Sequence, residues 1–312
     1  MQHSIVSRFE GALLGAVLGE VLGYYALTKA GQPREINRWF PGLSSTQAIP
    51  PSAIAPTLLA NGNRLIQQSG QITQIEPPKQ RDNAAILTLT NLPIVLLHHA
   101  SDWQLEQQLS QLIESWQIPT VTGKAWLEMS QAIARVLREN CPTAEWLLNL
   151  TAALGLPKLE PETTLQGVNS TAEATQSRSL TALGGLHDLP KRVQQLIPDS
   201  QAEGATAVLL ALVYFLRTPT NLPASLLAAA YAPSIPQLVC PLVGTFAGAM
   251  GGRASIPLMW SIHLEKTPLL GLYRADIHNL AQALFRSWAG VLSDDVQLEV
   301  AIAAPNIIRP RI

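Results

Sequence analysis

Apolar residues recur along most of the chain at intervals of three and four positions, in stretches rich in Ala and Leu. That spacing places apolar side chains on one face of a helix. Proline-rich breaks such as Ile49–Pro51 and Glu76–Pro78 separate the stretches, as expected where helices end. The alternation typical of a strand is nearly absent, with Ile86–Thr90 as the one modest candidate. The pattern predicts an all-α fold with helices over residues 8–30, 53–69, 103–115, 124–139, 143–154, 202–217, 222–232, 240–252 and 276–291.

Glycine occupies every fourth position in the first of these helices, at Gly11, Gly15, Gly19 and Gly23. Residues four apart lie on the same face of a helix. Each glycine in a helix interior costs about 1 kcal/mol of helix stability relative to alanine. Four glycines on one face are therefore unfavourable unless the absence of side chains there allows a close contact. We therefore expect the backbone of another segment to pack very closely against it.

Residues 157–200 interrupt the helical pattern, because Thr, Ser, Glu and Gln replace large apolar residues over much of this range. Such a composition is typical of a loop. Apolar helical patterns resume on both sides, and no repeat of fixed period is found. We therefore interpret residues 1–312 as a single compact multi-helix domain with a loop-rich excursion at 157–200.

Charged residues are few and scattered. They make up 14% of the 312 residues, against about 25% in typical domains, and the net charge is −1. A basic stripe that would neutralise phosphates is missing, so nucleic-acid binding is not expected. Cys141 and Cys240 form no CxxC pair and no disulfide framework. They favour buried thiols and a cytoplasmic location, with a disulfide between them as the alternative.

Residues 11–27 are long enough and apolar enough to be considered as a membrane span. Glu20 lies inside this run and would cost about 2.5–3.5 kcal/mol at the bilayer centre. Small residues are frequent there, since seven of the seventeen are Gly or Ala, and the N-terminus lacks the basic region of a signal peptide. We therefore expect a buried core helix and no membrane span.

Several motifs follow one another along the chain. They are Arg8–Gly23, with its Arg-Phe-Glu-Gly-Ala-Leu-Leu-Gly start, Thr90–Leu97, Phe215–Thr218, Gly244–Ala249 and Ile256–Trp260. In this order they resemble the ADP-ribosylglycohydrolase family, which includes the dinitrogenase reductase-activating glycohydrolase, with Glu20 where that family has an aspartate. Each motif alone is weak, and the ordered set is more specific. The resemblance implies an all-α domain of about a dozen helices.

Active members of that family hold two Mg²⁺ ions in a central cleft, where the metals position water and the substrate ribose. The family takes the ligands from a glutamate after the first helix, a Thr-Asp-Asp-Thr run and a late Asp-x-Asp-Thr run. In this chain the corresponding positions carry no carboxylate: they are Leu27 for the first, Leu43–Thr46 with Gln47 following for the second, and Val239, Pro241 and Leu242 for the third. Neutral hydroxyls and aliphatic side chains do not offset the dehydration of a divalent ion. The comparison therefore predicts no metal ligands, no catalytic residues and no cofactor.

Few other side chains suggest chemistry. Glu20 either lines the former cleft or is a capped structural carboxylate. The hydroxyl and amide groups of Ser44, Ser45, Thr46 and Gln47 either bind a ligand or cap a helix. His98 and His99 are adjacent, and on a helix they would point about 100° apart, so they are not expected to share a metal.

The leading hypothesis is a pseudoenzyme, an inactive ADP-ribosylglycohydrolase-like protein whose cleft binds a protein or an ADP-ribose-like small ligand. One alternative is a remodelled ADP-ribosyl hydrolase or glycosidase that works without the dimagnesium site and uses Glu20 as its acid–base group. The other is a protein that only scaffolds a complex. Fold resemblance alone does not separate these functions.

Overall fold

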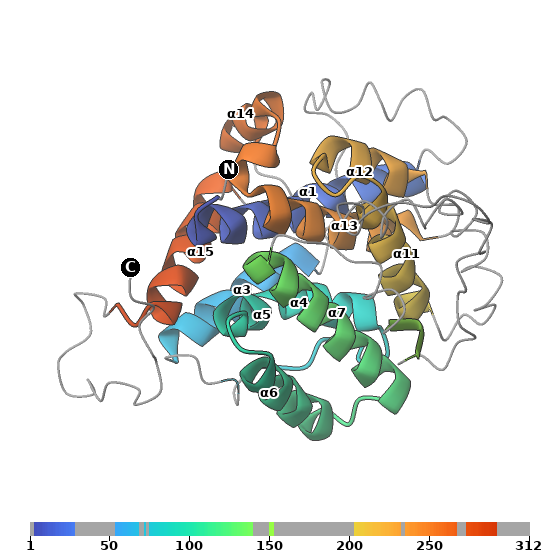
Figure 1. Cartoon of the computed structure of the whole chain (residues 1–312), viewed down its shortest axis with the longest axis vertical. Helices are drawn as coiled ribbons and strands as arrows, with labels where there is room; N and C mark the ends of the chain where they lie inside the picture. The colour runs from blue at the N-terminus through green and yellow to red at the C-terminus, as the bar shows by residue number, and fades with distance from the viewer. Residues whose placement is uncertain are drawn as a thin grey trace, which may run out of the picture.

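The computed structural model describes residues 3–28, 54–68, 72, 75–139, 150–152, 203–231, 235–266 and 273–291, and every regular element in these ranges is a helix (Figure 1). The all-α prediction is confirmed. The elements are α1 (Ile5–Thr28), α3 (Ile54–Gln67), α4 (Ala84–Thr90), α5 (Leu92–His98), α6 (Asp102–Ser115), α7 (Thr120–Glu139), α11 (Glu203–Arg217), α12 (Leu222–Ala230), α13 (Pro236–Gly251), the 3₁₀-helix η3 (Arg253–Ser255), α14 (Leu258–Lys266) and α15 (Arg274–Trp288).

The predicted helices that fall on described residues are present, with ends that differ from the prediction by a few residues. Only residues 150–152 of the predicted helix 143–154 are described, and they are helical. The predicted excursion at 157–200 lies outside the described residues. The short helices α5 and α14 are additions to the predicted set.

The one modest strand candidate, Ile86–Thr90, is not a strand, because these residues belong to α4. Asn83 caps the helix, since its side chain accepts hydrogen bonds from the amides of Ala85 and Ile86. The Thr88 hydroxyl donates to the carbonyl of Ala84, which hides a polar group inside a buried helix. Alternation of Leu and Thr therefore reflects burial on several sides of one helix, not the two faces of a strand.

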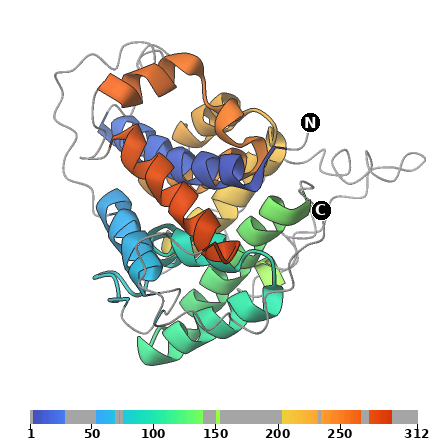
Figure 2. The same ribbon diagram turned by 90° about the vertical axis from the view of Figure 1, so that its left-hand side faces the viewer.

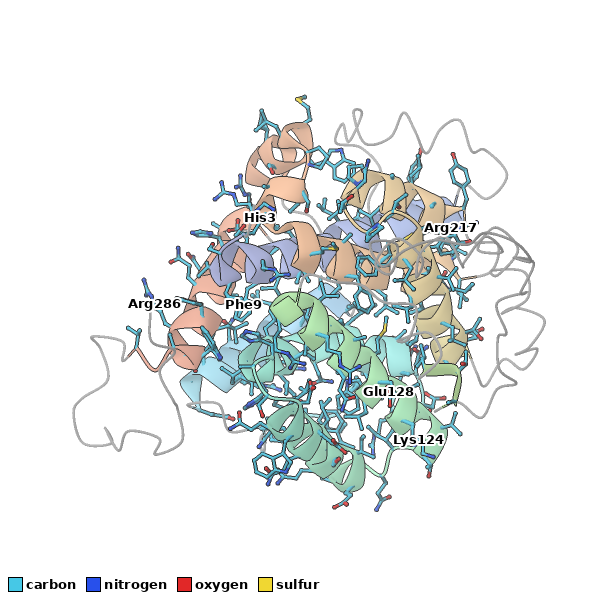
Figure 3. The ribbon with its side chains drawn as sticks, viewed as in Figure 1. His3, Phe9, Lys124, Glu128, Arg217 and Arg286 are labelled. Carbon is cyan, nitrogen blue, oxygen red and sulfur yellow. The ribbon has the colours of Figure 1, made fainter. Side chains whose placement is uncertain are left out.

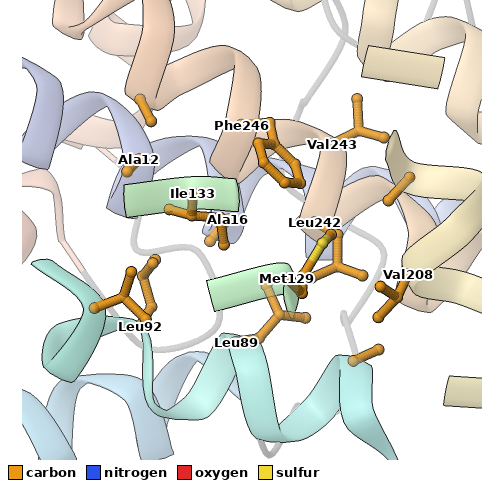
Figure 4. Close-up of a cluster of buried hydrophobic side chains, with 14 of the residues drawn as sticks. Ala12, Ala16, Leu89, Leu92, Met129, Ile133, Val208, Leu242, Val243 and Phe246 are labelled. Atoms are coloured by element: carbon orange, nitrogen blue, oxygen red, sulfur yellow. The ribbon is translucent and has the colours of Figure 1, made fainter. Parts of the chain in front are cut away.

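Helices α1 and α13 run antiparallel through the centre of the molecule and pack along almost their whole length. Helix α15 crosses α1 on its outer side, with α3 beyond it (Figure 2). Side chains from α1, α4, α5, α7, α11 and α13 meet in one buried apolar cluster, in which Ala16, Leu89, Ile133, Val208 and Phe246 are close neighbours (Figure 4). The core thus joins helices from both ends of the described chain.

The glycine face of α1 meets the backbone of α13, as the sequence predicted. A Cβ atom on Gly15 would lie 2.0 Å from the carbonyl oxygen of Gly244, and a Cβ on Gly244 would lie 2.0 Å from that of Gly15. Gly11 faces Gly248 in the same way, and Gly19 faces the carbonyl of Cys240. Real Cβ atoms do not come so close, so the two helices can cross at this distance only because glycine stands at these positions.

Arg8 joins the ends of two helices from inside the protein. Its Nε donates to the carbonyl of Ala249 (2.9 Å), and its two Nη atoms donate to those of Leu137 (2.6 Å) and Val136 (2.5 Å). These carbonyls belong to the last turns of α13 and α7, where no helical donor is available. A cation also suits the negative end of a helix dipole, so Arg8 stabilises both termini.

In the described ranges, none of the helices is both long and apolar enough to cross a bilayer. Cys240 is fully buried against α1, and burial raises the pKa of its thiol. Cys141 lies outside the described residues.

Candidate ligand site at the ends of α1, α3 and α13

Two of the three positions that the resemblance assigns to metal ligands lie on the two central helices, α1 and α13. The C-terminal half of α1 faces the first turns of α13, because Gly23 packs on the carbonyl of Pro236. Leu27 is one turn beyond Gly23, whereas Val239 and Leu242 are in the first turns of α13. Segments far apart in sequence therefore form one end of the central helix pair.

The side chains at these positions do not fit a pair of Mg²⁺ ions. Val239, Pro241 and Leu242 are buried and aliphatic, and Leu27 is exposed. None of them offers the oxygen atoms that Mg²⁺ requires. Over the described ranges, no group of three His, Cys, Asp or Glu side chains is arranged to hold a metal ion.

Glu20 lies on α1 near the same end and points to the start of α3. Its Oε2 accepts a hydrogen bond from the Ala55 amide at 3.2 Å. Burial raises the pKa of Glu20 to about 7, although the amides of Ala55 and Ile54 stabilise the carboxylate and partly offset that effect. The arrangement is that of a helix cap, in which a carboxylate meets the positive end of α3. Near neutral pH the group can both give and accept a proton.

The other predicted binding residues, Ser44, Ser45, Thr46 and Gln47, lie outside the described residues. Their role in binding a ligand or capping a helix stays a prediction.

Polar side chains that the sequence analysis did not propose as ligand-binding residues lie at this end of the molecule, although Arg217 belongs to the Phe215–Thr218 motif. The guanidinium of Arg217 stands 5.8 Å above the ring of Tyr214, at the C-terminal end of α11 (Figure 3). Burial raises the pKa of Tyr214, and Arg217 partly offsets this. Gln237 adds a buried side-chain oxygen without a hydrogen-bond partner within the described part of the chain. Arg217 and Gln237 carry hydrogen-bonding atoms, but neither supplies a second carboxylate for catalysis.

A second cluster of ionisable groups, also not anticipated, lies at the opposite end of α1. The carboxylate of Glu10 is 3% exposed and is surrounded by three basic side chains. His278 Nδ1 is 3.0 Å from Oε2, and the Nε atoms of Arg253 and Arg274 are 3.6 and 3.9 Å from Oε1. The residues come from α1, η3 and α15. No local motif could reveal the cluster, because 268 positions separate Glu10 from His278.

His98 and His99 do not form a metal pair. The ring of His99 packs between Phe9 (5.2 Å) and Trp288 (5.0 Å), and its Nδ1 lies 2.8 Å from the carbonyl of Leu96. Burial lowers the pKa of His99 to about 4, so the ring is neutral at pH 7. His99 is therefore a core residue that packs between the first turns of α1 and the last turn of α15.

An open pocket of about 320 Å³ lies between α3 and α15, lined by Leu59, Ile66 and Leu280 with Asn63 and Asn279. None of the residues that the sequence proposed as a site lines it. It is therefore separate from the candidate site at the other end of α3.

Neither a protein-family model nor a curated protein matches this chain. The likeness to ADP-ribosylglycohydrolases thus depends on the ordered motifs, and any function must be argued from the site.

Proposed function

We propose that the chain is an inactive ADP-ribosylglycohydrolase-like protein, a cytoplasmic pseudoenzyme that acts as a binding or scaffolding module. The observation that carries the proposal is the buried aliphatic set Val239, Pro241 and Leu242. On the helix that packs against α1, the resemblance calls for the late aspartates at Val239 and Pro241 and for a threonine at Leu242. Neither a metal-activated water nor a metal-held ribose can be supported by these side chains.

Helix packing and metal binding place different requirements on the sequence, and only the residues that packing requires match the family. The glycines of the first and late motifs face each other across the α1–α13 contact, where larger residues would clash. Arg8, from the same first motif, caps α7 and α13. These motifs, which this chain shares with the family, hold residues that close packing requires. The positions at which it differs from the family are those that would bind the metal ions. This division favours a retained scaffold without the hydrolase reaction.

Calorimetric titration with ADP-ribose, with and without MgCl₂, tests the proposal. We expect binding that is indifferent to Mg²⁺, together with no release of ADP-ribose from an ADP-ribosylated protein substrate. An active ADP-ribosylglycohydrolase serves as the positive control for the release assay. Mg²⁺-dependent binding or release would contradict the proposal, whereas no binding in either condition would restrict it to a protein partner.

The alternative is a metal-free ADP-ribosyl hydrolase or glycosidase with Glu20 as the acid–base group. The pKa of Glu20, about 7, favours it, because an acid–base catalyst works best near the ambient pH. In that case Glu20→Gln abolishes turnover of an ADP-ribosylated substrate. Glu114→Gln, at an exposed position on α6, is the matched control and should leave turnover unchanged. No turnover by the unaltered protein would rule this alternative out.

A further inference from the structure

We propose that Met259, on the first turn of α14, is a site of reversible oxidation, at which hydrogen peroxide converts the thioether to a sulfoxide while the fold stays intact. Figure 1 shows α14 at the edge of the molecule. Met259 is on a different helix from the residues of the candidate ligand site, and its oxidation does not depend on the proposed function.

The sulfur-containing side chains of the protein differ sharply in exposure. The sequence has four methionines and two cysteines, of which Met1 and Cys141 lie outside the described residues. Met259 is 65% exposed, whereas Met129 is 1% exposed and Met250 is partly buried against the core. Oxidation of methionine requires that the oxidant reach the sulfur, so it follows exposure. Among the described methionines, Met259 is therefore the one that peroxide reaches most readily.

The described cysteine does not compete for the oxidant. The thiolate, and not the thiol, is the form of cysteine that peroxide attacks. Cys240 is fully buried on α13, where its backbone carbonyl contacts the glycine face of α1. Burial raises the pKa of the Cys240 thiol, so the thiolate is scarce at neutral pH. Oxidation of the described side chains by peroxide thus begins at a methionine.

The exposure of Met259 follows from the way in which α14 is anchored. Ile256 and Trp260 stand on either side of it in the sequence, and both belong to the buried apolar cluster. The Trp260 amide donates to the carbonyl of Pro257 at 3.0 Å, which closes the first turn. Successive residues of a helix point about 100° apart, so a turn that buries Trp260 directs its neighbour away from the core. The sulfur of Met259 is accessible without any opening of the fold.

The reaction is a two-electron oxidation of sulfur. A sulfur lone pair attacks one oxygen of hydrogen peroxide, so that an S–O bond forms as the O–O bond breaks. The departing hydroxide takes the proton of the transferred oxygen and leaves as water. Methionine sulfoxide reductases remove the oxygen again, with a thiol as the reductant. The first turn of α14 thus alternates between an apolar and a polar surface.

The position of the sulfur also decides what oxidation does to stability. At Met259 the sulfoxide oxygen is in contact with water, so the folded state loses little. Met129 lies in the buried cluster (Figure 4), where a sulfoxide oxygen would be removed from water. Burying a polar group without a hydrogen bond is unfavourable. Oxidation is therefore expected to leave the free energy of unfolding unchanged for as long as it is confined to Met259.

Peroxide treatment of the full-length protein, followed by tryptic digestion and mass spectrometry, measures the rate at each methionine. Met129, Met250 and Met259 fall in separate tryptic peptides, at residues 125–135, 218–253 and 254–266. We expect Met259 to be oxidised at least about tenfold faster than Met129 in the folded protein, and faster than Met250. In concentrated urea the three rates should agree within about twofold, because exposure then no longer differs. Fragment spectra distinguish oxygen on Met259 from oxygen on Trp260, which is in the same peptide.

Met259→Leu is the matched variant, because it keeps an apolar side chain and removes the sulfur. It should abolish the gain of oxygen in peptide 254–266 and leave the rates at Met129 and Met250 unchanged. Methionine sulfoxide reductases, added to the folded and oxidised protein, should restore Met259. Urea denaturation of protein oxidised only at Met259 should give the midpoint of the untreated protein.

Four results would overturn the proposal. The first is equal rates at Met259 and at either other methionine in the folded protein, and the second is a preference for Met259 that persists in urea. The third is a sulfoxide that the reductases do not remove from the folded protein. The fourth is a lower midpoint after oxidation that Met259→Leu abolishes. Titration of the untreated protein with ADP-ribose is independent of all four, so the proposed function can hold or fail separately.

Discussion

The protein buries four ionisable residues, Arg8, Glu10, Glu20 and His99, and accommodates them in two ways. Arg8 is charged and uses helix carbonyls, whereas Glu10 is surrounded by basic side chains. Glu20 and His99 instead have pKa values that burial moves toward the neutral form. Folding stability must therefore depend on pH through the last two.

Glu20→Gln is predicted to stabilise the protein above pH 7. Folding raises the pKa of Glu20 from 4.5 to about 7, so the folded state favours the protonated acid. The protonated Glu20 side chain makes its full contribution to the free energy of unfolding below pH 4.5. That contribution is lost as the pH rises through 7, and the loss is at most about 3 kcal/mol. Gln is neutral at every pH and keeps an oxygen for the Ala55 amide.

The test compares the free energy of unfolding of the two proteins by urea denaturation at pH 5 and pH 8. The gain from Glu20→Gln should be clear at pH 8 and shrink at pH 5. The comparison is made between variants because His99, with its pKa near 4, changes stability in the opposite direction, losing its contribution as the pH falls from 6.5 to 4. An equal gain at both pH values would contradict the raised pKa.

Arg8→Lys is predicted to destabilise the protein by about 2–4 kcal/mol, although the charge is kept. One ammonium cannot reach the carbonyls of Ala249, Leu137 and Val136 together, so helix-end acceptors are left buried without a donor. Urea denaturation measures the loss. Arg286→Lys, at an exposed position, should change stability by less than about 0.5 kcal/mol. A similar effect of the two substitutions would mean that the three bonds contribute little.

At the scale of the elements, α1 and α13 form the tightest pair among the described helices, and Gly15→Ala tests this contact. The added Cβ meets the backbone carbonyl of Gly244, which cannot move aside without separating the helices. We expect a loss of more than about 3 kcal/mol or failure to fold. Gly123→Ala, also within a helix, meets only the Ile113 side chain at 3.1 Å and should change stability by about 1 kcal/mol at most. Thermal unfolding of both variants separates packing from helix propensity.

Element prediction succeeded where local pattern and burial agree. The helix predicted at 103–115 is present as α6 (Asp102–Ser115), and Ser101, which caps it, accepts from the Gln104 amide. It failed at α4, where Ile86 to Thr90 alternates although Ala84 to Thr90 is helical. Alternation cannot distinguish a half-buried strand from a short helix that is covered on most sides, because the covering helices α3, α7 and α11 are not visible locally.

At the scale of the molecule, the core connects both ends of the described chain, since α1 packs on α13 and α15. We therefore predict that the secondary structure and the tryptophan environment unfold in a single transition. Trp126 reports on α7, and Trp260 and Trp288 report on α14 and α15. Circular dichroism and tryptophan fluorescence in urea should give the same midpoint. Separate midpoints would indicate units that unfold independently.

The sequence by itself determined the helical class, the buried nature of α1 and the need for a close backbone partner, because these follow from spacing and from the cost of glycine in a helix. The family resemblance, which stays a prediction, puts Leu27, Ser44, Ser45, Val239 and Pro241 at the positions of its carboxylates. Only the tertiary structure decided that the partner of Gly15 is Gly244, that Glu20 caps α3 and that Glu10 meets His278. Those contacts depend on how helices cross, and the crossing is set by side chains and backbones far apart in the chain.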